Sequence, residues 1–110
     1  MNTRKILIAL FITSLGITSV SLLWKLPLFL IIVLILLALL KHKYSPIKKE
    51  LALFILSGII ATITESLMMS SGAWFYQAPQ VINFPIWLPF LWGLAGTTGI
   101  TLYEGLIGKK

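Results

Sequence analysis

The sequence predicts an all-α integral membrane bundle of four transmembrane helices, with residues 1–110 forming a single membrane domain. Hydrophobic residues make up 58% of the chain and charged residues 11%, which is too little polar surface for a soluble domain of this size. Four apolar runs are long enough to cross the hydrocarbon layer. If the chain crosses four times, eight of its nine basic residues fall on one side, and only Lys25 falls on the other.

Composition also excludes several classes of function. The chain has no cysteine, so it offers no disulfide framework, zinc knuckle or thiol chemistry. The net charge of +6 does not indicate a nucleic-acid partner, because the basic residues sit at the ends of apolar runs, where they anchor helices and meet anionic headgroups. We expect no nucleic-acid partner, no cofactor and no metal.

The first apolar run, Ile6 to Leu23, predicts a helix over about residues 5–23. Its basic start also fits a signal peptide, but Ser19-Val20-Ser21 is a poor cleavage site, so we expect a retained helix. Pro27 interrupts the pattern. An unbroken helix from Arg4 to Lys41 would measure about 57 Å, against about 30 Å of hydrocarbon, so a tight hairpin is expected instead.

The second run, Leu26 to Leu40, predicts a helix over about residues 27–42. It contains one small residue, Ala38, and no polar stripe, so we expect lipid over much of its surface. Because the run is short, Lys41 and Lys43 are expected to extend outward to the interface.

The third helix is predicted over about residues 47–69, with Ser45 as its N-cap. His42 is interpreted as a solvated loop histidine, and Glu50 as a surface residue that favours the helix dipole. The fourth helix is predicted over about residues 84–106, capped by Asn83. Pro85 and Pro89 then fall in or next to its first turn, where a missing N–H costs least.

Small and hydroxyl residues indicate which helices touch, because apolar side chains gain little by clustering in lipid. They recur at four-residue spacing on three of the helices: Gly93, Thr97, Thr101 and Gly105; Ser57 with Ala61 and Gly58 with Thr62; Ser14 with Thr18. The residues expected to carry the closest packing are Gly58, Ala61, Gly93, Thr97 and Thr101. We therefore expect the first, third and fourth helices to form the packed unit, with the second more peripheral.

Glu65 is the sharpest functional signal. An acidic residue within a span costs about 2.5–3.5 kcal/mol on insertion scales, and no lysine or arginine lies at its depth to pair with it. Three states remain open: a protonated carboxyl, a carboxylate hydrogen-bonded to indoles, Tyr76 or hydroxyls, or a group wetted from outside. The candidate ligand or proton site comprises Glu65, Trp74, Tyr76, Trp87 and Trp92. The competing interpretations are a helix-end acid and an interfacial aromatic belt. Glu104 is expected to extend to the opposite interface, and no catalytic residue is assigned.

The stretch from Thr64 to Leu106 also carries a pattern. Its elements are Glu65-Ser66-Leu67, Gly72 before Trp74 to Tyr76, Pro85-Ile86-Trp87-Leu88, Leu91-Trp92 and Thr97-Thr98. In these motifs the chain resembles a family of small bacterial inner-membrane proteins of unknown function, whose members more often have Asp at the position of Glu65. The resemblance implies a membrane location and no particular activity.

These observations predict a polytopic protein of the bacterial cytoplasmic membrane, with both termini in the cytoplasm by the positive-inside rule. Its expected partners are the lipid bilayer and a second copy or another membrane subunit. The leading function is non-enzymatic binding of a small ligand or partner at Glu65. The alternatives are an oligomeric proton-coupled transporter and a membrane enzyme acting on a lipid or isoprenoid.

Overall fold

The computed structural model describes all residues from 1 to 110. It contains four helices, α1 (Thr3–Leu23), α2 (Pro27–Tyr44), α3 (Glu50–Met69) and α4 (Leu88–Leu106), which confirms the all-α prediction. Helices α1, α2 and α3 are long and apolar enough to cross a membrane, and α4 does not meet the same criterion. The physical reason is composition, since α4 is rich in glycine and threonine where the other helices have leucine and isoleucine.

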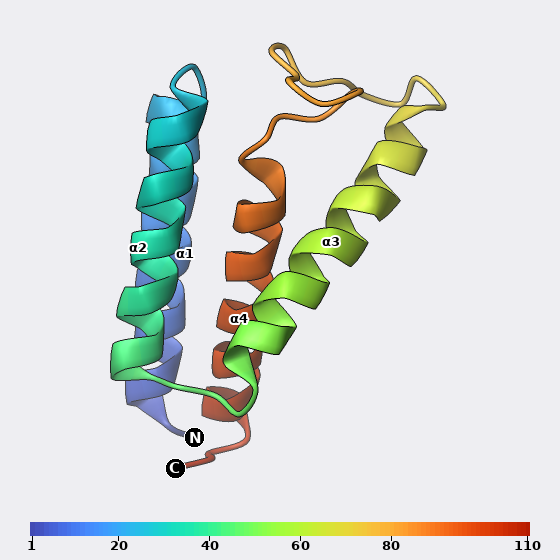
Figure 1. The fold of residues 1–110 in the computed structure, drawn as a ribbon. Coiled ribbons are helices and arrows are strands. Elements are labelled where there is room, and N and C mark those ends of the chain that lie inside the picture. Colours follow the sequence, from blue (N-terminus) through green and yellow to red (C-terminus); the bar gives the residue numbers. More distant parts are fainter.

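Helix α4 occupies the centre of the bundle. The α1–α2 hairpin packs on one side of it and α3 on the other (Figure 1). The expectation that α1, α3 and α4 form the packed unit is confirmed in part: α4 makes its most extensive contacts with α3 and with α1, although α3 makes no comparable contact with α1. Helix α2 has the least extensive contacts of the four helices, as expected, but it packs against both α1 and α4 and contributes three leucines to the buried core.

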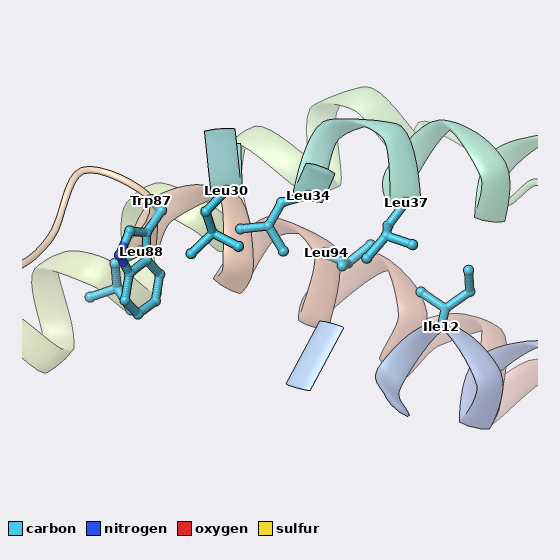
Figure 2. Close-up of a cluster of buried hydrophobic side chains, with 7 residues drawn as sticks. All are labelled: Ile12, Leu30, Leu34, Leu37, Trp87, Leu88 and Leu94. Atoms are coloured by element: carbon cyan, nitrogen blue, oxygen red, sulfur yellow. The ribbon is translucent and has the colours of Figure 1, made fainter. Parts of the chain in front are cut away.

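Leucine packing accounts for the position of α2. A cluster of buried apolar side chains joins α1, α2, α4 and the segment before α4; its members are Ile12, Leu30, Leu34, Leu37, Trp87, Leu88 and Leu94. Figure 2 shows the three leucines of α2 pointing toward α4. Close van der Waals packing drives helix association in lipid, and interdigitated leucines provide it here without a small-residue ridge.

Large apolar side chains cover the outside of the bundle. Leu22, Leu28 and Leu51, for example, are all exposed, and each belongs to or adjoins a different helix. A soluble monomer rarely shows such continuous apolar surface. A lipid bilayer around the helices accounts for it.

Two predicted boundaries differ from the structure. Helix α3 begins at Glu50 rather than near residue 47, and its N-cap is Lys49 in the left-handed conformation (φ 55°), not Ser45. The Ser45 amide instead donates to the Lys41 carbonyl and extends α2 to Tyr44. The Glu50 carboxylate accepts the Ile47 amide at 3.1 Å, so the intervening residues form a turn rather than a first helical turn.

Helix α4 begins at Leu88 rather than at residue 84, and Asn83 does not cap it. The side chain of Asn83 instead reaches back to α3, where its Nδ2 donates to the Ser66 carbonyl at 3.0 Å and its Oδ1 accepts from Ser66 Oγ at 2.6 Å. At the other end of the chain, α1 starts at Thr3, and Asn2 caps it by accepting from the Lys5 amide.

The two ends of the bundle differ in charge. Both termini and the α2–α3 connection lie at one end, and the α1–α2 turn and the long connection after α3 lie at the other (Figure 1). Eight of the nine basic residues therefore belong to segments at the first end, which we call the basic end. Lys25 belongs to the α1–α2 turn at the opposite end, which we label the outer end for reference only.

Candidate functional site

The connection between α3 and α4, residues 70–87, is called the outer connection here. The Glu65 carboxylate lies beside it, with three neutral aromatic donors around the two oxygens. Its Oε1 accepts from Trp74 Nε1 at 3.3 Å and from the Tyr76 hydroxyl, and its Oε2 accepts from Trp92 Nε1 at 2.7 Å. Glu65 is 8% exposed and makes no ion pair. Three donors reach the two oxygens, so the contacts match the hydrogen-bonded interpretation, and the low exposure does not match a group wetted from outside.

The residues between α3 and α4 are held in place to form this site. Helix α3 ends at Met69, and Gly72 supplies the positive φ of 86° that turns the chain back over the bundle. The two hydrogen bonds between Ser66 and Asn83 hold the returning segment against α3. A short bridge between Val81 and Phe84 then leads into α4.

Trp87 belongs to the same group of residues without touching the carboxylate through a hydrogen bond. Its ring meets Tyr76 edge to face, with 5.9 Å between the centroids. Trp87 is buried in the leucine cluster, whereas Trp74 is 39% exposed and covers Glu65 from outside. The five predicted site residues thus meet at one place, in two layers: Trp74, Tyr76 and Trp92 on the carboxylate, and Trp87 behind Tyr76.

Burial raises the pKa of the Tyr76 phenol above its ordinary value, and the hydrogen bond to Glu65 and the charge of Glu65 raise it further. A raised folded-state pKa means that the phenol contributes stability below the ordinary tyrosine pKa of about 10. That contribution is lost as the pH rises through the folded-state pKa.

We expect the phenolate absorbance of Tyr76 to be missing at the pH where free tyrosine ionises, about 10. The measurement is an ultraviolet pH titration of the native protein in detergent, with Tyr76→Phe subtracted to isolate the one residue. After denaturation, the difference signal should appear at the ordinary pH. A native difference titration with its midpoint in the ordinary tyrosine range would contradict the geometry.

Glu50 lies in a buried ion pair, which corrects its interpretation as a surface residue. Its Oε2 meets Lys41 Nζ at 2.9 Å, and its Oε1 meets His42 Nδ1 at 2.8 Å. The histidine side chain is itself exposed, as expected, but it has a partner. Helix α3 places Glu50 inward because the turn before it hydrogen-bonds to the same carboxylate.

Lys41 does not extend to the interface; it is fully buried, at 0% exposure. Besides Glu50, its ammonium group donates to the Thr101 hydroxyl at 2.7 Å and to the Ser45 carbonyl at 3.0 Å. An ammonium group has three N–H donors, so all three are used. The lysine side chain does not reach the interface because three acceptors lie inside the bundle, on α3, on α4 and at the end of α2.

Glu104 is buried as well, contrary to the expectation that it reaches the interface. Its two oxygens meet Lys5 Nζ at 2.7 Å and Lys109 Nζ at 3.1 Å. The backbone reinforces this contact between the two ends of the chain, since the Asn2 amide donates to the Gly105 carbonyl at 2.7 Å. Lys5, Lys41, Glu50, Thr101 and Glu104 form what we call the basic-end cluster.

The basic-end cluster was not predicted from the sequence. The available signal was that acidic and basic residues occur at the same end of different helices, as Glu50 does with Lys41 and Glu104 with Lys5. Lysines near helix ends usually reach the interface, and that general tendency hid the pairing. The consequence for function is that Glu104 pairs with Lys5 and Lys109 and shares no contact with the groups that bind Glu65.

The chemistry open to the Glu65 site is limited. No group of three or more His, Cys, Asp or Glu side chains is arranged to hold a metal ion. A second titratable group, the Tyr76 phenol, contacts the Glu65 carboxylate, whereas Glu104 does not. A scan against protein-family models, a search of curated proteins and a search of solved structures each found no match.

The five residues expected to pack closely do not share one interface but lie in different surroundings. Gly58 of α3 lies against the backbone of Pro89, and Gly93 of α4 against Phe54. Thr97 is buried with its hydroxyl bonded to its own helix, and Thr101 is held by Lys41. Ala61 is half-buried. In α1 the inward residues are instead Lys5, Ala9, Ile12 and Gly16, and Ser14 and Thr18 are exposed and bond their own helix.

Replacing Gly58 with alanine is expected to lower the free energy of unfolding by about 1–3 kcal/mol. A Cβ there would lie 2.5 Å from the Pro89 carbonyl oxygen, and that backbone atom cannot rotate away. Gly99→Ala is the matched control, because a Cβ at Gly99 meets nothing within 4 Å. Thermal unfolding followed by tryptophan fluorescence compares the two. Equal midpoints would show that α3 and α4 are not packed this closely.

Proposed function

We propose that this multi-span membrane protein binds an organic cation at the Glu65 site, without catalysing a reaction on it. One observation carries the proposal. Of the three acidic residues, Glu50 and Glu104 are both paired with lysine, and Glu65 alone is surrounded by neutral donors. The site therefore has a buried carboxylate and no charge to compensate it.

The aromatic side chains supply the second half of a cation site. A carboxylate in a medium of low dielectric constant is stabilised strongly by an opposite charge close by. The faces of tryptophan and tyrosine attract quaternary ammonium groups, and cages of these rings with an acid are a recurring way to bind them. Trp74 makes the longest of the three hydrogen bonds to Glu65 and is the most exposed of the rings, which supports entry of the cation from the outer end past Trp74.

The same proposal includes the placement of the chain. We propose that α4 crosses the bilayer with α1, α2 and α3, since it packs between the α1–α2 hairpin and α3 and exposes few polar groups. The positive-inside rule then puts the basic end in the cytoplasm and the Glu65 site on the outer side of a bacterial inner membrane. The motifs around Glu65 support kinship with the small inner-membrane family that they resemble.

Choline and its uncharged isostere dimethylbutanol test the proposal directly. Each is titrated into the full chain in uncharged maltoside micelles while tryptophan fluorescence is recorded, because three tryptophans belong to the site. We expect choline to bind at least about tenfold more tightly than the alcohol. Glu65→Gln should abolish this preference, and Thr64→Ala, an exposed neighbour on α3, should keep it. Equal responses to the two compounds, or an unchanged response in Glu65→Gln, would overturn the proposal.

A further inference from the structure

A groove between α1 and α4 adjoins the Glu65 site and is open to the surrounding lipid. Its volume is 350 Å³ and its lining is almost wholly apolar. Small residues on both helices create the space, chiefly Gly16 of α1 with Ala95 and Gly99 of α4. A Cβ at Gly99 would meet nothing within 4 Å, so the groove is empty of protein atoms at this point.

Trp92 connects the groove to the carboxylate. The residue lines the outer end of the groove, and its indole N–H donates to Glu65 Oε2 at 2.7 Å. From Trp92 the groove runs inward past Gly99, about 10 Å at 1.5 Å per residue of helix. A molecule that placed a charged group at Glu65 could therefore lay an attached chain directly into the groove.

The polarity of the groove also matches a hydrocarbon chain. Thr98 is among the lining residues, but it is 4% exposed and its hydroxyl oxygen is buried away from the open space. The hydroxyl therefore presents no polar contact to an occupant, and the surface that the groove offers is almost wholly apolar.

We infer that the natural ligand is a single-chain cationic amphiphile, with its ammonium group at Glu65 and its hydrocarbon chain in the groove between α1 and α4. This inference rests on the proposed cation site and adds the class of ligand. Charge selects the head, because Glu65 has no cationic partner in the protein. The apolar lining and its opening to lipid select the chain, which can enter sideways from the bilayer.

The test compares tetramethylammonium, which has only the head, with decyltrimethylammonium, which has head and chain. Both compounds are titrated into the protein, residues 1–110, in maltoside micelles, with tryptophan fluorescence as the readout. The critical variant is Gly99→Leu, which fills the groove without a backbone clash; Ala95→Leu is a second groove-filling variant. Ala52→Leu adds similar bulk at an exposed position of α3 outside the groove and serves as the control, since all variants share the same micelle partitioning.

We expect the decyl compound to bind the native protein about tenfold more tightly than tetramethylammonium or better, because chain methylenes leave water and mobile detergent for a fitted surface. Either groove-filling variant should remove this advantage and leave tetramethylammonium binding unchanged, and Ala52→Leu should change neither. If Glu65→Gln abolishes binding of both compounds while the groove-filling variants do not affect the decyl compound, the groove assignment is wrong and the cation site stands. If neither compound binds, or if decyl binding survives Glu65→Gln, both proposals fail.

Discussion

Replacing Lys41 with methionine is expected to lower the free energy of unfolding by about 3–5 kcal/mol. Methionine keeps most of the side-chain volume but removes the charge that meets Glu50 at 2.9 Å. The Glu50 carboxylate then stays buried with only the exposed His42 as a possible counter-charge, and the Thr101 hydroxyl loses the donor that it now accepts from. Thermal unfolding of the detergent-solubilised protein measures the loss.

Lys43→Met is the matched control for this experiment, since Lys43 lies on the same helix and is exposed. Its unfolding midpoint should be close to that of the native chain. The double variant Lys41→Met with Glu50→Gln should recover part of the loss, because it removes the uncompensated charge as well. A Lys41→Met variant as stable as Lys43→Met would show that Lys41 is not inside the bundle.

Replacing Glu65 with alanine is expected to release the outer connection, residues 70–87. Three donors, on Trp74, Tyr76 and Trp92, lose their acceptor at once. Two of these donors, on Trp74 and Tyr76, belong to the connection and tie it to α3, and a hydrogen bond of this kind contributes about 0.5–1.5 kcal/mol. The connection should therefore detach and let more water reach the rings. We expect a red shift of tryptophan emission and faster proteolysis within residues 70–87.

Thr64→Ala provides the comparison. Like Glu65→Ala it replaces a polar side chain with a methyl group, but Thr64 is exposed and lies next to Glu65 on α3. Its emission spectrum and its rate of cleavage should match those of the native protein. Protection of residues 70–87 that survives Glu65→Ala would mean that Ser66 and Asn83 hold the connection without the carboxylate.

Local sequence signals predicted the helices well and their ends less well. Apolar run length located all four helices, and Pro27 marked the hairpin between α1 and α2. The two misplaced starts have a common physical cause. At Glu50 and at Asn83, a side chain bonds to a distant partner or to the preceding turn instead of serving the helix end. Capping rules assume a local partner, so tertiary hydrogen bonds override them.

The contacts between helices were harder to predict. The ridge of small residues on α4 indicated a face in close contact with other helices, and its members are buried. The position of α2 could not be inferred in the same way, because leucines that face lipid and leucines that interdigitate look alike in sequence. Leu34 is buried and Leu36 is exposed, and this difference depends only on which of the two side chains faces the neighbouring helix.

The candidate site illustrates the same limit. Glu65 stood out because an acid within a span is costly, and the aromatic residues stood out by their density. That Trp74, Tyr76 and Trp92 would donate to the two carboxylate oxygens depends on the path of the connection between α3 and α4. Two hydrogen bonds between Ser66 and Asn83 determine that path, and their spacing in the sequence gives no local pattern.

Infrared difference spectroscopy of the Glu65 carboxylate tests the central claim most directly. The spectrum of the protein with choline minus the spectrum without it reports any carboxylate whose surroundings change on binding. We predict a shift of one carboxylate stretching band on choline addition, absent in Glu65→Gln and absent with dimethylbutanol. A native difference spectrum without a carboxylate band, or the same band in Glu65→Gln, would contradict the assignment of Glu65 as the residue that binds the cation.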